Sequence, residues 1–429
     1  MGHAGSCRGY HTFNFFNKCN AELFSEITNI FTTVADSNPY IKRFPLTNSD
    51  GKNFGWEYCF KEHKGIRWQL VHYDIKGHTF YGIRTIINPE ALIYGNYLTA
   101  ANERDLYLTE IKYNAIAEKL SLPISKFKDC SLSRADYCIN FDVSELGLPC
   151  TAEQLIQLFK RGDIPSTFTE RKVYDQNSHR WRSEPYSLYL KQDSVNINCY
   201  WKYPELNKIC PTFEFKDYAK DVVRFEVQCK YVKLYSMIKG INTESRYTEI
   251  YKNKRGDFSP EYISADDLIY DELSEDECVT VHVPKIPIDV GLSNKISNNI
   301  VSQYYQKIVG KGDYLTLDGA RKVVQSHEFR ADKEKRLLWA LELISLKRGI
   351  TKAKEGLDED DSERLARSIN DLNSILINPV TIPCSWNILY IKNPMRAFEE
   401  LGKPILMRSK SETKVLDHIY HYLRTARQA

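Results

Sequence analysis

Three stretches in the middle of the chain alternate between apolar and polar residues, at positions 132–143, 195–202 and 221–231. Successive side chains of a strand point to opposite faces, so each stretch predicts a β-strand with one apolar and one polar face. The three polar faces carry Arg134, Asp136, Cys138, Asn140 and Asp142; Asn196, Asn198, Tyr200 and Lys202; and Arg224, Glu226, Gln228 and Lys230. If these strands lie side by side, their polar faces form one surface that can carry chemistry.

Other extended patterns and helical patterns surround these three strands. The runs WEYCF, IRWQLVHYDI and TFYGIRTII precede Asn88-Pro89, which ends the last run. Apolar residues at helical spacing predict helices over about 102–120 and 152–161. A further strand at 186–191 predicts a hairpin with the central stretch, with its turn at Gln192-Asp193.

The last third of the chain has a different pattern. Residues 253–295 are acidic and have turn-forming prolines at 284 and 287, whereas 302–373 shows the spacing of buried helices. We therefore expect an α+β fold, with an antiparallel-rich central sheet, helices on one face, a functional site on the open face and a mostly helical C-terminal part. The expected domains are 1–270, which would bear the site, a linker or trailing extended segment at 271–300, and a helical domain at 301–429.

Composition narrows the class of protein. A chain of 429 residues is long enough for two or three domains. Its net charge of +3 excludes a uniformly basic coat but permits a local basic groove. The 11 cysteines are scattered without a CxxC pair, which favours free thiols in a reducing cytosol over a disulfide framework or a zinc site. No run of about 18 apolar residues is present, so we expect no membrane span.

The polar faces hold the residue types that phosphodiester cleavage by transesterification needs. A tyrosine phenol such as that of Tyr200 can form a covalent phosphotyrosyl intermediate, and a nearby Lys202 could lower the phenol pKa or stabilise transition-state charge. Arg134 and Arg224 each stand two residues before a carboxylate and could orient it or bind phosphate. Those carboxylates, Asp136 and Glu226, are hard oxygen ligands suited to Mg²⁺ or Mn²⁺. Taken singly, an Arg-x-Asp or Arg-x-Glu pair is most often an ordinary surface ion pair, and the case for chemistry depends on the three strands together.

Residues 164–185 are polar and predict a loop that leads into the hairpin. The loop is basic because it contains His179 and four permanent cations, Arg171, Lys172, Arg180 and Arg182. These four could contact DNA phosphates near a cleavage site. A solvated surface loop explains the same composition.

The three strands also occur in a recognisable order. The blocks LSRADYCINFDV, INCYWKYPELNK and VVRFEVQCKYVKLYSMIKG resemble those of the gene II/X family of phage and plasmid replication proteins. The upstream segment YGIRTIINPEALIYGNYL and the downstream segment KEKRLLWALELISLKRGITKAKEGL are similar to the flanking parts of that family. The resemblance covers roughly residues 65 to 380, and the more distant trans-acting plasmid Rep initiators share a similar order of blocks.

This resemblance implies a rolling-circle replication initiator with a sheet like that of Rep and relaxase nucleases. Such an endonuclease nicks one strand at the origin, forms a 5′-phosphotyrosyl intermediate, leaves a free 3′-OH primer and later rejoins the strand. The aligned nucleophile is Tyr200, with Tyr203 as its rival on the opposite strand face. Related nucleases bind metal through a histidine pair, but His72 and His78 are six residues apart. We therefore expect Mg²⁺ or Mn²⁺ on Asp136 and Glu226, with Glu205 as a third ligand.

The implied partners are origin DNA, single-stranded or in a hairpin, and a host helicase, in the cytoplasm of a bacterial host. The resemblance is also compatible with a homodimer, and with a protein encoded by either a phage or a plasmid. Two other functions stay open. A conjugative relaxase would use the same nicking chemistry, and a non-catalytic origin-binding protein would need to lack the nucleophile or the acidic pair.

Overall fold

A computed structural model describes most of the chain. The described residues are 6–48, 51–60, 64–75, 78–95, 97–175, 179–209, 212, 216–238, 247–253 and 278–401. The sequence also predicts a last helix near 413–427, which lies outside these residues. None of the described helices is both long and apolar enough to cross a membrane.

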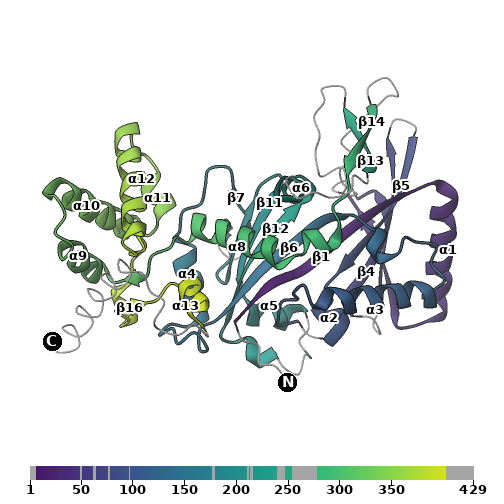
Figure 1. Ribbon diagram of the computed structural model, residues 1–429, viewed down its shortest axis with the longest axis horizontal. Helices are drawn as coiled ribbons and strands as arrows, with labels where there is room; N and C mark the ends of the chain where they lie inside the picture. The colour runs from purple at the N-terminus through teal and green to yellow at the C-terminus, as the bar shows by residue number, and fades with distance from the viewer. Residues whose placement is uncertain are drawn as a thin grey trace.

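The chain folds around a ten-stranded sheet in which every neighbouring pair is antiparallel (Figure 1). In spatial order the strands are β2 (Ile41–Thr47), β3 (Asn53–Phe60), β4 (Ile66–Ile75), β5 (His78–Ile87), β1 (Cys7–Cys19), β6 (Leu132–Asp142), β12 (Val222–Lys230), β11 (Val195–Trp201), β10 (Ser187–Lys191) and β7 (Thr169–Glu170). The three strands predicted from alternation are β6, β12 and β11. They are direct neighbours, which confirms that their polar faces form one surface.

The apolar face of the sheet is covered by helices, as predicted. These helices are α1 (Ala21–Ser37), α3 (Asp105–Lys119), α4 (Ala152–Phe159), α6 (Tyr231–Ile238), α7 (Ile288–Gly291) and α8 (Asn294–Ile308). Phe15 of β1 packs edge-on against Tyr113 of α3, and Phe141 of β6 lies 5.5 Å from Tyr305 of α8. Large buried rings of this kind supply much of the apolar area that holds the two layers together.

The polar face is not open over β6 and β12, which corrects the expectation from the sequence. Both faces of these strands are buried, and Asn140 and Arg224 are fully inaccessible to solvent. Part of the cover is the segment 97–101, which follows α2 (Pro89–Tyr94); the Leu98 carbonyl accepts hydrogen bonds from both side chains. A small apolar cluster joins this segment to α5 (Lys202–Ile209) through Leu98 and Leu206.

Gly9 lets the 97–101 segment approach β1 closely. The neighbouring Tyr10 exchanges two backbone hydrogen bonds with Ala101, of 2.8 and 2.9 Å. A Cβ on Gly9 would lie 1.9 Å from the Ala101 carbonyl oxygen. We expect Gly9→Ala to push this segment away and lower the free energy of unfolding by about 1–3 kcal/mol, as overpacking does elsewhere. Urea unfolding measures this, and an unchanged unfolding midpoint would contradict the close approach.

The C-terminal region is largely helical, as predicted, and lies at the end of the molecule remote from α1 (Figure 1). It contains α9 (Leu317–Gln325), α10 (Ala331–Lys347), α11 (Ile350–Lys354), α12 (Glu359–Ser374), α13 (Pro394–Glu400) and the strand pair β15 (Tyr314–Leu315) and β16 (Tyr390–Ile391). The expected domain boundaries stay a prediction. Within the segment expected as a linker, β14 (Cys278–Pro284) pairs with β13 (Tyr247–Asn253), and α8 begins at Asn294.

Candidate active site

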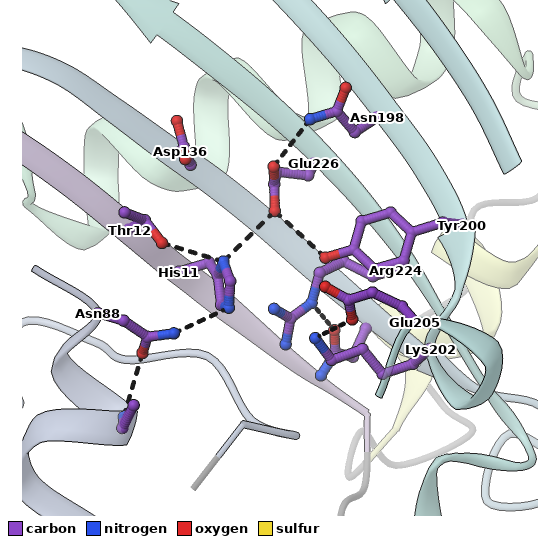
Figure 2. A network of polar contacts seen from close by, with 12 residues as sticks. His11, Thr12, Asn88, Asp136, Asn198, Tyr200, Lys202, Glu205, Arg224 and Glu226 are labelled. Carbon is purple, nitrogen blue, oxygen red and sulfur yellow. Dashed lines mark hydrogen bonds and ion pairs between the residues drawn. The ribbon is translucent and has the colours of Figure 1, made fainter. Parts of the chain in front are cut away.

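Glu226 is the centre of a network of polar side chains on the covered face of the sheet (Figure 2). Its Oε1 accepts a hydrogen bond of 3.0 Å from the Asn198 amide, and its Oε2 accepts one of 3.5 Å from the Tyr200 hydroxyl. The register explains this grouping, because Glu226 is paired with Asn198 of β11, and the next polar position, Arg224, is paired with Tyr200.

The ionisation of Glu226 is shifted toward neutral pH. Burial disfavours the carboxylate, and the negative charge of Asp136 acts in the same direction. The positive charges of Arg224 and Arg134 oppose these effects, and the pKa of Glu226 rises to about 7. Glu226 can therefore exist in either protonation state near neutral pH, as a group that exchanges protons must.

His11 is a member of the network that the sequence reading did not identify. Its Nδ1 lies 3.6 Å from Glu226 Oε2, and its Nε2 lies 3.1 Å from the Asn88 amide nitrogen. The Asn88 amide oxygen accepts from the Ala91 backbone N–H at the start of α2, so the amide nitrogen donates to Nε2. Burial and the charges of nearby cations lower the pKa of His11. In the neutral ring the Nδ1 proton then lies toward Thr12 Oγ1, at 3.2 Å, and toward Glu226 Oε2, at 3.6 Å.

A β-bulge explains why alternation did not place His11 at the site. Tyr10 pairs with Tyr137 and Thr12 with Asp136, so His11 is the extra residue between them. Bulges commonly redirect a side chain. Simple alternation would have placed His11 with Phe13 on the apolar face. The only sequence signal was a histidine in a strand of alternating aromatic and polar residues.

Tyr200 is held as a neutral phenol in this structure. Its side chain is almost fully buried, and burial together with the negative charges of Glu205 and Glu226 raises its pKa well above the usual range. The positive charge of Arg224 acts in the opposite direction. The sequence suggested that Lys202 lowers the pKa of this phenol, but burial and the two carboxylates outweigh any such effect. A phenol in this environment needs a proton acceptor to become a nucleophile.

Two buried cations flank the phenol. Arg224 donates from Nε to Asn140 Oδ1 at 2.7 Å and from Nη2 to the carbonyls of Leu98 and Thr99 at 2.8 and 2.9 Å. Its Nη1 has no hydrogen-bond partner within the part of the chain that the structure describes. A buried guanidinium with one unused donor nitrogen can donate to a further oxygen, such as one of a phosphate.

Lys202 is the second buried cation, and its position differs from the prediction. It is the first residue of α5 and not a strand residue. Its Nζ nevertheless lies 5.5 Å from the centre of the Tyr200 ring and donates to Glu205 Oε2 at 2.6 Å. Burial and the charge of Arg224 lower the pKa of Lys202, while Glu205 raises it.

The rival tyrosine, Tyr203, lies outside the Glu226 network. It belongs to α5, so the expected location on the opposite strand face is wrong. Its ring lies 6.1 Å from Trp201, and the Lys220 ammonium is 5.6 Å from the ring centre. Its ring therefore contacts an indole and a lysine ammonium, and not the carboxylate of Glu226.

The carboxylates expected to bind metal are each held by another partner. Arg134 donates to both oxygens of Asp136, at 2.8 and 2.6 Å, and Lys202 holds Glu205. Among the described residues no group of three His, Cys, Asp or Glu side chains is placed to hold a metal ion. The three carboxylates thus do not fit a preformed metal centre in this conformation.

The basic segment expected as a loop contains a two-stranded hairpin, formed by β8 (Lys172–Asp175) and β9 (Arg180–Ser183). Strand pairing needs no apolar alternation when both faces are solvated, which explains why the pattern predicted a loop. The four predicted DNA-contacting cations are all exposed: Arg171, Lys172, Arg180 and Arg182. Tyr174 and Trp181 face each other across the hairpin at 5.5 Å, and both rings are largely exposed.

Fold and site together define an α+β protein whose antiparallel sheet carries a buried tyrosine, hydrogen-bonded to a carboxylate and flanked by two buried cations. No protein-family model and no curated protein matches the sequence. Among solved structures, the chain is similar to a rolling circle replication initiator protein from Geobacillus stearothermophilus, at 10% identity and a TM-score of 0.27. This likeness covers 55% of this chain and 78% of that one. At such a TM-score it supports no conclusion about function, which has to come from the chemistry of the site.

Proposed function

We propose that the protein is a rolling-circle replication initiator that nicks one DNA strand at an origin and later rejoins it. The observation that carries this proposal is the grouping of a phenol, a carboxylate that can accept its proton, and two buried cations. Tyr200, Glu226, Lys202 and Arg224 are brought together from β11, β12 and α5. Nucleophile, base and phosphate-binding cations are the parts that transesterification of a phosphodiester requires.

In the proposed reaction the Tyr200 oxygen attacks the phosphorus atom in line with the 3′ oxygen of the preceding nucleotide. The phenolic proton passes to Glu226, whose Oε2 already accepts a hydrogen bond from that hydroxyl. The new bond joins phosphorus to the tyrosine oxygen, and the bond to the 3′ oxygen breaks. That oxygen takes up a proton and becomes the free 3′-OH primer. Arg224 and Lys202 stabilise the charge that develops on the phosphate oxygens.

Mg²⁺ or Mn²⁺ stays part of the proposal without entering these steps. Asp136, Glu226 and Glu205 are the residues that would hold the ion, and Asp136 and Glu205 would first have to leave their cationic partners. Magnesium is commonly bound by one or two carboxylates together with substrate phosphates. When bound, the ion would polarise the phosphate and neutralise part of its charge.

The decisive experiment incubates the protein with supercoiled plasmid that carries its own replicon, with Mg²⁺ or Mn²⁺ and with chelator. Conversion to open circles, with protein attached to the 5′ end, supports the proposal. An origin-plasmid replication assay separates replication from the conjugative relaxase alternative. Sequence-specific binding without any cleavage would instead favour the non-catalytic origin-binding protein. A helicase partner, a homodimer and a bacterial cytoplasmic location are proposals that follow from the replication function.

The β8–β9 hairpin is the proposed DNA-contacting element outside the active site. Its exposed cations suit phosphates, and the rings of Tyr174 and Trp181 suit stacking on unpaired bases. Replacing Arg171, Lys172, Arg180 and Arg182 with alanine should weaken origin binding. Each lost phosphate contact flattens the slope of log affinity against log salt by a little under one, so the slope should fall by roughly two to four.

A matched control replaces four exposed lysines elsewhere with alanine. Suitable positions are Lys42, Lys119, Lys128 and Lys347. This variant loses the same formal charge but should keep most of the salt dependence. If the hairpin variant and the control show equal slopes, the hairpin is only a solvated surface element.

A further inference from the structure

Two arginines lie together where the turn after α4 meets the end of α10. The backbone N–H of Ile350, at the start of α11, donates to the Arg161 carbonyl at 2.8 Å. Gly349 fits closely here, because a Cβ on it would lie 3.1 Å from the same carbonyl oxygen. These backbone contacts fix Arg348, the residue between α10 and Gly349, beside Arg161.

The two side chains line a cavity of about 420 Å³, within the size range of small-molecule sites. None of the described residues that line its wall is acidic. Its members with groups that could recognise a ligand are Arg161, Ser345, Arg348, Thr381, Ser385 and Trp386. The cavity thus combines two cations, several hydroxyls and one indole ring.

The described part of the chain leaves the charges of the two arginines, Arg161 and Arg348, without a neutralising carboxylate. Partial burial and the like charge of Arg348 both lower the pKa of Arg161. Placing a half-buried cation beside a second cation costs electrostatic free energy, and a bound anion would offset that cost.

The backbone of Arg348 is a second, independent observation. Its φ of 59° lies in the left-handed region, at the position that ends α10. Glycine or asparagine is usual at such a helix end, because a larger side chain is strained there. Strained residues of this kind often serve a binding site. Here the strained residue contributes a guanidinium to the cavity.

We propose that this cavity binds a nucleotide, with its phosphate between Arg161 and Arg348 and its base against Trp386. Guanidinium groups bind phosphate through paired hydrogen bonds, and indole rings stack on bases. Free nucleotide and a nucleotide within a DNA strand share this chemistry. The site is separate from Tyr200 and does not depend on the proposed nicking activity.

The test uses the full chain and isothermal titration with pyrophosphate, ATP and a dT15 oligonucleotide as probes. We expect binding of pyrophosphate and ATP, with each affinity lowered roughly tenfold or more in Arg161→Gln and in Arg348→Gly, as for other lost charge-assisted hydrogen bonds. Arg348→Gly also relieves the left-handed strain, so its thermal midpoint should not fall. Lost binding in this variant cannot then be attributed to unfolding.

Two further variants sharpen the test. Arg367→Gln removes an exposed arginine of α12 and should leave binding unchanged. Trp386→Ala should weaken ATP binding but not pyrophosphate binding. If ATP binds and the affinity for dT15 is the same with and without the Arg348 side chain, the ligand is a free nucleotide. If the affinity for dT15 also falls in Arg348→Gly, the site accepts a DNA strand as well. Absence of pyrophosphate and ATP binding at millimolar concentration, or equal ATP affinity in Arg348→Gly, would overturn the proposal.

Discussion

Tyr200→Phe is expected to abolish nicking while leaving DNA binding intact. The substitution removes only the phenolic oxygen, the atom that would attack phosphorus. Loss of a covalent nucleophile lowers turnover by about 10⁴- to 10⁶-fold. The hydroxyl also donates a long hydrogen bond of 3.5 Å to Glu226, whose other oxygen keeps its bond to Asn198. The fold should therefore tolerate the change. Plasmid nicking, covalent attachment to labelled oligonucleotide and a gel shift measure the three effects separately.

Tyr203→Phe is the matched control, because it removes the same atom from the neighbouring tyrosine. Its ring packs near Trp201 and Lys220, away from the carboxylate at the centre of the site. Nicking and covalent attachment should remain near the wild-type level in this variant. The assignment of the nucleophile is wrong if Tyr203→Phe loses attachment and Tyr200→Phe retains it.

The arrangement of the site strands could be predicted because it depends on a local property, the alternation of side chains. In β6, β11 and β12 the alternation correctly placed Asp136, Tyr200 and Glu226 on one face. Cross-strand pairing then had to bring these three side chains together. A one-residue change in the register of a strand would turn its polar side chains toward the helices and bury them there. The α+β class and the helices on the apolar face followed from the same patterns.

The cover over the site could not be predicted, because it depends on contacts between distant parts of the chain. The Nη2 atom of Arg224 donates to the carbonyls of Leu98 and Thr99, more than a hundred residues away. His11 reaches Glu226 only through a bulge in β1, which shifts the alternation by one position. The sequence showed that Arg134 and Asp136 are two residues apart. It could not show that Arg134 occupies both carboxylate oxygens of Asp136, which would otherwise be free for a metal ion.

Glu226→Gln is expected to have opposite effects on activity and stability. Glutamine cannot take the phenolic proton, so nicking should fall by about 10²- to 10⁴-fold, the usual contribution of a general base. The amide keeps an oxygen that can accept from Asn198, so the local geometry should persist. The variant should fold, and its loss of activity would reflect chemistry.

The stability effect depends on pH, and its sign follows from the raised pKa. A carboxyl with a pKa of about 7 in the folded protein and 4.5 otherwise binds its proton more tightly when folded. The stabilisation is full below pH 4.5 and is lost as pH rises through 7. Wild type therefore loses up to about 3 kcal/mol between pH 4 and pH 8 from this group, which the variant does not lose. The unfolding midpoint of Glu226→Gln should exceed that of wild type at pH 8 and approach it at pH 5.

Asp136→Asn separates proton transfer from metal binding. Removing this charge should lower the pKa of Glu226, because Asp136 is one of the groups that raise it. If Glu226 acts as the base, the pH at which nicking begins should shift downward while activity persists. If Asp136 and Glu226 instead hold Mg²⁺ or Mn²⁺, both variants should lose metal binding, measured by calorimetry, and nicking together. Wild-type pH dependence in Asp136→Asn, with full nicking in Glu226→Gln, would contradict both roles of the carboxylates.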